Sequence, residues 1–248
     1  SDFAGSTLVH ACGGAAALAG VIVLGARSGR YTSQGGKRAM VPFAASSIPL
    51  VTLGTFLLWF GWFGFNGFSQ LAMGTFDDVN AISKIAVNTH LAGAAGTVTG
   101  AAMTRLIGGK TDIVMMLNGA LAGLVAITAE PLTPGPITAM AIGSIGAVIM
   151  YYGTKMLERL GLDDVVGAIP VHMFAGIFGT LVVPFTNGNT DFGTQFVGMF
   201  SVVVFSFVLS YLTFTAMKAT IGLRISKEAE KLGTDKAEVG VIAYSIRD

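Results

Sequence analysis

Long apolar runs without charge alternate with short charged segments along the 248 residues of the chain. A helix needs about 20 apolar residues to cross a bilayer. Seven segments without Lys, Arg, Asp or Glu approach or exceed that length. The predicted spans are Phe3–Ala26, Ile48–Ala72 within the uncharged run Ala39–Phe76, Ile85–Thr104, Ile113–Ala129, Thr133–Thr154, Val165–Thr190 and Phe192–Met217.

The runs are too long and too uniformly apolar for the short alternating strands of a transmembrane barrel. The pattern therefore predicts an all-α membrane protein, with a transmembrane domain over residues 1–217 and a tail over 218–248. Composition agrees, because only 12% of residues are charged, against about 25% in soluble domains. The net charge of +1 indicates no nucleic-acid partner. Since no basic stretch precedes the first span, we expect a processed chain or part of a longer polypeptide rather than a signal peptide.

Basic residues gather in alternate loops and in the tail. The loops after the first, third and fifth spans and the tail hold every Lys and Arg except Lys84. The positive-inside rule places these segments in the cytoplasm. The first span then runs inward, the chain begins outside, and its C-terminus is cytoplasmic.

A short pattern occurs twice. Asp is followed by Gly three positions later, Val seven later and His eight later, from Asp2 to His10 and again from Asp164 to His172. Eight helical residues rise about 12 Å, nearly halfway through a hydrocarbon core of about 30 Å. Because the two segments enter from opposite sides, both histidines are expected near the midplane, as in an inverted-topology repeat.

The histidine pair is the main candidate for function. Histidines inside membranes are rare and usually face a bundle interior or a pathway. Two facing imidazoles could share a proton and present polar edges to a small ligand. The alternative is two separate core histidines that bond to the backbone.

Aromatic and small residues form two further patterns. In Leu58–Ser69, helical spacing places Trp59, Trp62 and Phe63 on one face, and Gly61, Gly64, Phe65 and Phe68 on another. Such faces can attract a cation, although simple packing explains their composition as well. The Gly96–Gly100 and Gly119–Gly123 patterns predict close helix packing. No phosphate loop, metal cluster or nucleophile–base pair is recognisable, so we expect no enzyme, no cofactor and no metal site.

Five segments resemble signatures of the Amt/Rh ammonium transporter family, in the same order and over essentially the whole chain. The family has eleven helices, and the resemblance assigns this chain to helices five to eleven, so four further helices are expected before Ser1. The segments are Asp2–His10, Trp59–Asn66, Asn88–Gly96, Asn118–Thr128 and Gly167–His172.

The resemblance implies a role for six residues in ammonium and ammonia transport. His10 and His172 match the twin pore histidines, Phe65 the inner gate aromatic and Trp62 a pore-wall tryptophan. Ser69 matches the serine of the outer recruitment site, and Asp2 the acidic residue beneath that site. The other gate phenylalanine and the recruitment tryptophan belong to helices one to four. Ammonium would be recruited and deprotonated outside, and ammonia would pass the histidines.

The sequence departs from the family in two places. Phe68 stands where the family often has glycine, which could narrow the outer vestibule. In the tail, Gly233, Asp235, Gly240, Ala243 and Tyr244 match, but Val239 and Val241 replace the His and Glu that usually flank the glycine. Regulation by a PII-type protein is therefore doubtful.

The resemblance also implies a homotrimer in the inner or plasma membrane. Two other functions stay open. An ammonium sensor would couple the same body to a signalling domain. A haem-binding electron-transfer protein would use His10 and His172 as axial ligands.

Overall fold

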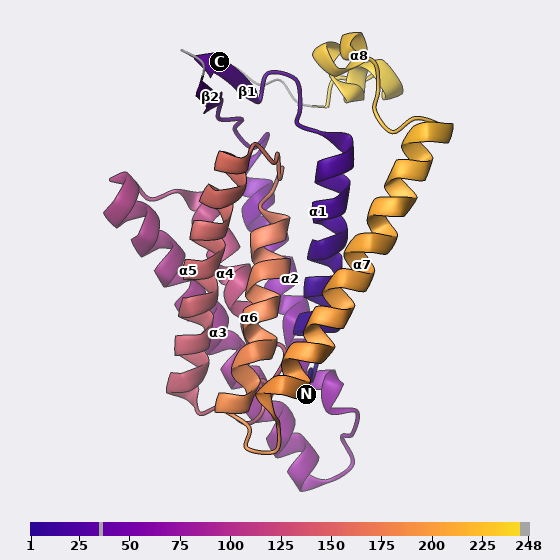
Figure 1. The fold of residues 1–248 in the computed structure, drawn as a ribbon. Helices are drawn as coiled ribbons and strands as arrows, with labels where there is room; N and C mark the ends of the chain where they lie inside the picture. Colours follow the sequence, from indigo (N-terminus) through magenta and orange to yellow (C-terminus); the bar gives the residue numbers. More distant parts are fainter. Residues whose placement is uncertain (35–36, 244–248) are drawn as a thin grey trace.

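The computed structural model describes residues 1–34 and 37–243, and most of them are helical. Figure 1 shows the helices side by side, with a small hairpin and a short helix beyond one end. The helices are α1 (Cys12–Leu24), α2 (Ile48–Gly67), α3 (Phe76–Gly108), α4 (Ile113–Ile127), α5 (Pro136–Leu160), α6 (Ala175–Val182), α7 (Phe192–Thr220) and α8 (Lys227–Leu232). The strands are β1 (Tyr31–Gln34) and β2 (Lys37–Met40).

Each predicted span overlaps a helix of the described residues. Four helical segments are long and apolar enough to cross a membrane, namely Ser6–Leu24, Ile48–Gln70, Pro136–Leu160 and Phe192–Thr220. Two apolar helices, Ile113–Ile127 and Ile169–Phe185, are shorter. The chain is an α-helical, multi-pass membrane protein.

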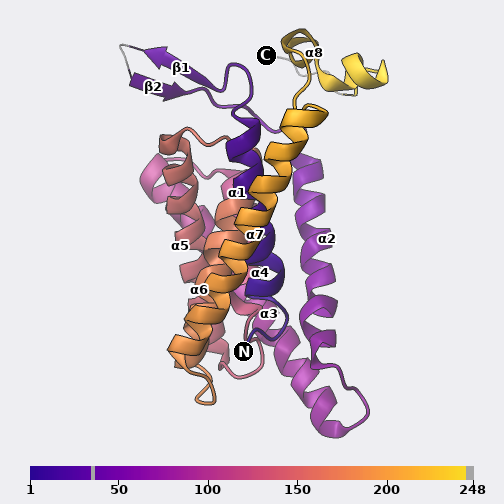
Figure 2. The same cartoon turned by 45° about the vertical axis from the view of Figure 1, so that its right-hand side comes forward.

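Helices α3, α4 and α5 pack against one another, and α1 lies along α7. Figure 2 shows α7 crossing the front of this assembly, with α2 beside it. The chain enters α1 from the end that holds the N-terminus, whereas α6 runs in the reverse direction (Figures 1 and 2). This opposed direction agrees with the predicted inverted repeat.

The predicted close packing of the glycine patterns is confirmed in α3 and α4. A Cβ added to Gly119 would lie 2.6 Å from the carbonyl oxygen of Gly96 and 3.2 Å from the Cα of Gly100. Carbon atoms normally approach only to about 3.5–4.0 Å. The two backbones can therefore meet only because these positions carry no side chain.

Several helices begin or end away from the predicted boundaries. Helix α3 begins nine residues before Ile85, because Thr75 and Asp78 form a reciprocal capping box at its start. Helix α5 continues to Leu160 and so includes charged residues that the span search excluded. The first and sixth spans begin later than predicted, at Ser6 and Ile169.

The all-α membrane fold predicted from the sequence is confirmed, and one small hairpin outside the membrane helices adds to it. Strands β1 and β2 pair in antiparallel register, with Tyr31 opposite Met40. The segment is polar and basic, so a search for apolar helices passes over it. The membrane part of the described chain remains helical.

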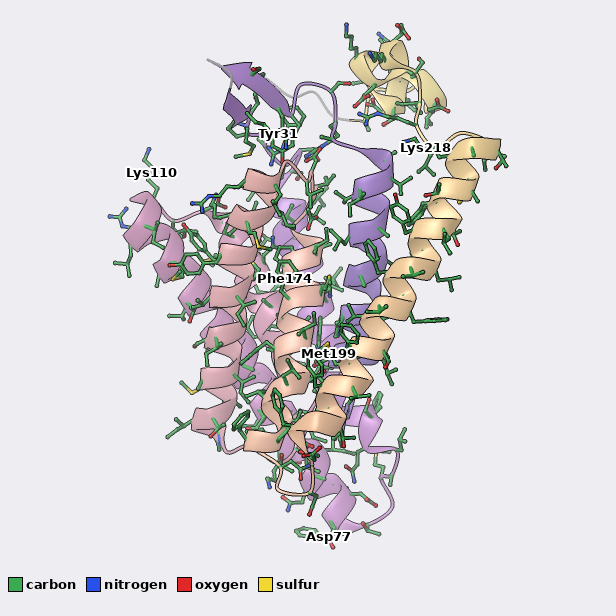
Figure 3. All side chains as sticks on the ribbon, in the orientation of Figure 1. Tyr31, Asp77, Lys110, Phe174, Met199 and Lys218 are labelled. Atoms are coloured by element: carbon green, nitrogen blue, oxygen red, sulfur yellow. The ribbon has the colours of Figure 1, made fainter. Side chains whose placement is uncertain are left out.

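Charge separates the two ends of the molecule. Figure 3 shows Lys110 and Lys218 at the end that carries the hairpin and α8, and Asp77 at the opposite end. We call these the basic end and the acidic end. Tyr244 and Arg247 of the predicted tail lie outside the described residues.

Candidate functional site

Two π-helical turns carry the repeated histidines. Ser6–Ala11 contains His10, and Ile169–Phe174 contains His172. Each turn follows a left-handed glycine, with φ of 107° at Gly5 and 77° at Gly167. Glycine adopts such angles without the Cβ clash that other residues meet. The repeat seen in sequence is therefore also a repeat of backbone geometry.

The repeated aspartates cap these turns. The Asp2 carboxylate accepts the backbone N–H groups of Thr7 at 3.1 Å and Leu8 at 2.8 Å. The Asp164 carboxylate accepts three backbone N–H groups at 2.7–3.0 Å, those of Gly167, Ala168 and Ile169. A carboxylate is favoured at a helix N-terminus, where N–H groups lack helical partners. Burial raises the pKa of the Asp2 carboxyl above its ordinary value, although these N–H donors act to lower it.

The two histidines face each other between the turns. Their Nδ1 atoms lie 3.2 Å apart, and the ring centroids are 5.3 Å apart at 20°. Two neutral imidazoles can form this bond only if one ring donates its proton and the other accepts it. One Nε2 is then an acceptor and the other a donor. The Nε2 of His10 is buried and has no partner among the described residues.

Two aromatic side chains from α2 enclose His10. The Trp62 ring stacks on His10 at 4.9 Å and 17°, and Phe65 lies 5.6 Å from it. Trp62 is buried, and its Nε1 donates to the Thr128 hydroxyl at 2.9 Å. That hydroxyl in turn donates to the Leu124 carbonyl at 2.7 Å. The indole is thus fixed in place by a buried hydrogen-bond chain.

Ser69 lies toward the acidic end, beyond the last turn of α2. Its hydroxyl donates to the Phe65 carbonyl at 2.7 Å, and the side chain is half-buried. Phe68 is 72% exposed. A Cβ added to Gly64 would lie 3.4 Å from the Phe68 ring. The structure therefore joins Trp62 and Phe65 to His10, whereas none of the contacts described joins Ser69 to the histidines.

A second aromatic cluster, which the sequence pattern did not predict, surrounds His90 of α3. Trp59 lies 5.5 Å from this ring, and Phe63 stacks on it at 6.1 Å and 19°. The predicted face of Trp59, Trp62 and Phe63 is thus divided, since Trp62 turns to His10 instead. Trp59 and Phe63 are four residues apart and so lie side by side on the helix surface, which is the feature of the sequence that could have predicted a shared contact.

A buried carboxylate ties the loops together at the basic end. Asp163 accepts from Nε and Nη2 of Arg27 at 2.7 and 2.8 Å, and Arg30 lies 3.2 Å away. Burial alone would raise the pKa of Asp163, but the hydrogen bonds and charge of Arg27 hold it below its ordinary value. The loop after α1 is thereby fastened to the loop before the His172 turn.

The tail is fastened to the same end of α1. Glu230 of α8 accepts the backbone N–H of Ser28 at 2.8 Å and Nη2 of Arg224 at 2.7 Å. Lys218 donates to the Val23 carbonyl at 2.7 Å. Basic side chains near a helix C-terminus bond its free carbonyls and complement its dipole. The tail, which follows α7, is thereby attached to the C-terminal end of the helix that follows His10.

The histidine geometry does not fit an axial haem pair. Imidazole nitrogens bind metals at about 2.0–2.1 Å, so one iron between two of them needs about 4 Å. The observed separation is 3.2 Å between rings that stack nearly parallel. No group of three potential metal-ligating side chains occurs within the described ranges.

The sequence matches the Ammonium Transporter Family over residues 1–244. It is 43% identical to ammonium transporter Amt2 of Archaeoglobus fulgidus, over 98% of this chain and 55% of that protein. It is 35% identical to ammonium transporter Amt2 of Methanocaldococcus jannaschii, over 98% of this chain and 56% of that protein. The chain spans about half the length of these relatives.

Solved structures agree. A Sensor Amt protein superposes with a TM-score of 0.88 at 35% identity, over 96% of this chain and 60% of that one. Candida albicans Mep2 gives a TM-score of 0.81 at 28% identity, over 96% of this chain and 55% of that one. The chain therefore belongs to the ammonium transporter family.

Proposed function

We propose that the protein carrying this chain transports ammonium across a membrane, along a path that passes His10 and His172. The observation that carries this proposal is the imidazole pair, held 3.2 Å apart among apolar helices, with one buried nitrogen that has no partner among the residues that the structure describes. A buried polar atom without a partner is costly. It gains a hydrogen bond whenever a small polar molecule passes. The names of the relatives support ammonium as the substrate.

The cation loses a proton before it enters the apolar path. Burying a bare charge forfeits its hydration, which is far costlier than burying a neutral molecule. Ammonium can avoid that cost by giving up one proton and passing as ammonia. Potassium has no proton to lose, so the same path excludes it.

The histidine pair can carry the released proton. A proton that binds the accepting Nε2 of one ring lets the shared Nδ1 proton move to the other ring. The second ring then releases its Nε2 proton on the far side, where ammonia takes it up again. Each transfer leaves both tautomers reversed, so the pair must reset before the next proton.

The outer recruitment site is formed by residues near the acidic end. Ser69 offers a hydroxyl to the recruited cation. Phe65, as the inner gate aromatic, and Trp62, as a pore wall, line the path that leads from this site to His10. Asp2 acts indirectly, because backbone N–H groups already occupy its carboxylate oxygens. Its negative charge favours the approach of a cation.

The basic end faces the cytoplasm, in accordance with the positive-inside rule. The transmembrane domain of residues 1–217 then ends in a cytoplasmic tail of residues 218–248, in an inner or plasma membrane. The family supports a homotrimer as the working assembly. Because Val239 and Val241 replace the His and Glu that usually flank the tail glycine, we do not propose a PII-type protein as a regulator.

Histidine substitution in the whole protein tests the proposal. The variants are His10→Ala and His172→Ala, expressed in cells that lack their own ammonium transporters. Uptake of methylammonium, or its selectivity over potassium, should fall in both. His90→Ala is the matched control, since that ring contacts Trp59 and Phe63 instead of the pair. Unchanged uptake and unchanged potassium exclusion in both pair variants would refute the proposal.

A sensor function is not favoured over transport. A solved Sensor Amt protein superposes well, but the curated relatives of comparable or higher identity are named transporters. The described residues contain no feature that distinguishes sensing from transport.

A further inference from the structure

Two glycines lie where the histidine helices cross. Gly14 follows His10 by four residues, and Gly176 follows His172 by four residues. The inverted repeat therefore extends one helical turn beyond the histidines. Residues four apart lie on the same face of a helix, so each glycine faces in about the same direction as its histidine.

Gly14 packs against the backbone beside His172. A Cβ added to Gly14 would lie 2.5 Å from the backbone nitrogen of Met173 and 2.8 Å from its Cα. Met173 directly follows His172 in the chain. These are backbone atoms, so no side-chain rotation can relieve the overlap.

Gly176 makes the reciprocal contact. A Cβ there would lie 2.5 Å from the carbonyl oxygen of Ser6 and 3.1 Å from the backbone nitrogen of Ala11. Ala11 directly follows His10, and Ser6 begins the same π-helical turn. Each glycine thus supports the backbone that carries the histidine of the opposite helix.

We infer that Gly14 and Gly176 are positioning residues for the ammonium path, because they set the distance between His10 and His172. The inference rests on the proposed transport function. A methyl group at either glycine needs about 3.5 Å from its neighbours, so the two backbones must separate by about 1 Å. The two Nδ1 atoms would then lie beyond the 3.5 Å limit of a hydrogen bond. The proton on one Nδ1 could no longer bond to the Nδ1 of the other ring.

The chain provides two matched controls. A Cβ on the adjacent Gly13 would meet nothing within 4 Å, so Gly13→Ala tests the substitution itself. Gly119 lies at an equally close crossing of α3 and α4, which carries neither His10 nor His172. Gly119→Ala therefore tests tight packing without displacement of the pair.

Transport is measured in the whole protein, as initial methylammonium uptake per folded molecule in the membrane. Gly14→Ala and Gly176→Ala should lower it about tenfold or more, since a misplacement of about 1 Å can cost about a hundredfold. Gly13→Ala should stay within about twofold of the unsubstituted protein. Gly119→Ala should reduce the amount of folded protein more than the uptake per molecule.

A double substitution separates positioning from general packing. In the His10→Ala background the pair is already lost, so adding Gly14→Ala should change uptake per molecule less than about twofold. A full tenfold further loss in that background would overturn the inference. So would uptake by Gly14→Ala equal to that of Gly13→Ala.

Nitrogen-15 NMR of histidine-labelled protein supplies a readout that does not need transport. The hydrogen-bonded Nδ1 signal, assigned by its loss in His10→Ala, should persist in Gly13→Ala and Gly119→Ala and disappear in Gly14→Ala. Persistence in Gly14→Ala would overturn the inference. If the signal behaves as expected but the unsubstituted protein takes up no methylammonium, the transport proposal fails and the positioning role stands.

Discussion

Replacement of Thr128 by valine tests how Trp62 is held against His10. The substitution keeps the shape of the side chain but removes the hydroxyl that accepts from the indole Nε1 at 2.9 Å. Thr128 is fully buried, so water cannot replace the lost partner. A buried donor left unpaired costs about 1–3 kcal/mol.

Measured hydrogen bonds inside membrane proteins are weaker, about 0.6 kcal/mol on average and about 1.7 kcal/mol at most. The two ranges overlap near 1 kcal/mol, which is the expected loss for Thr128→Val. The Leu124 carbonyl also loses the Thr128 hydroxyl as a donor.

The assay is a double-mutant cycle of reversible unfolding in detergent. Trp62→Phe removes the N–H group itself, so no unpaired donor remains when Thr128→Val is added. The cost of Thr128→Val should therefore fall from about 1 kcal/mol to a few tenths in the Trp62→Phe background. An equal cost in both backgrounds would show that the bond does not hold the indole.

Two further predictions concern the basic end. Asp163→Asn should destabilise the protein by about 3 kcal/mol at neutral pH, measured by unfolding in detergent. Breaking a buried ion pair costs about 3–5 kcal/mol, and the low end is expected because the partly exposed Arg27 can turn to water. A loss below about 1 kcal/mol would contradict this account. Contact with Arg224 and Ser28 lowers the pKa of Glu230 to about 2, from an ordinary value of 4.5. A lowered carboxyl pKa gives stability that is complete above pH 4.5 and lost as pH falls toward 2. Limited proteolysis of the tail should therefore be constant from pH 5 to 8 and faster in Glu230→Gln, and an equal rate in both proteins would refute the contact.

The sequence located the membrane helices because their apolar runs are long and almost free of charge. It placed the helix ends less well, since ends depend on local bonds. Asp164 and Gly167 delay the start of the sixth helical segment, and the capping box at Thr75 advances the start of α3. The hairpin was missed because its strands are polar.

The histidine pair could be predicted because equal spacing from two aspartates implies equal depth. The surroundings of the pair could not be predicted in the same way. Helical spacing alone does not say which side of α2 faces which neighbour, so Trp59 and Trp62 were placed on one face although they contact different histidines. The contact of Gly14 with Met173 joins residues far apart in the chain.

The most direct test of the central proposal is transport by the purified whole protein in liposomes. An imposed ammonium gradient should change the internal pH or membrane potential faster than in empty liposomes, and an equal potassium gradient should not. Substitution of His10 and His172 together should abolish this selectivity or the flux, whereas His90→Ala should leave both intact. An ammonium response no faster than that of empty liposomes would contradict the proposal, as would one that is unchanged without the histidine pair.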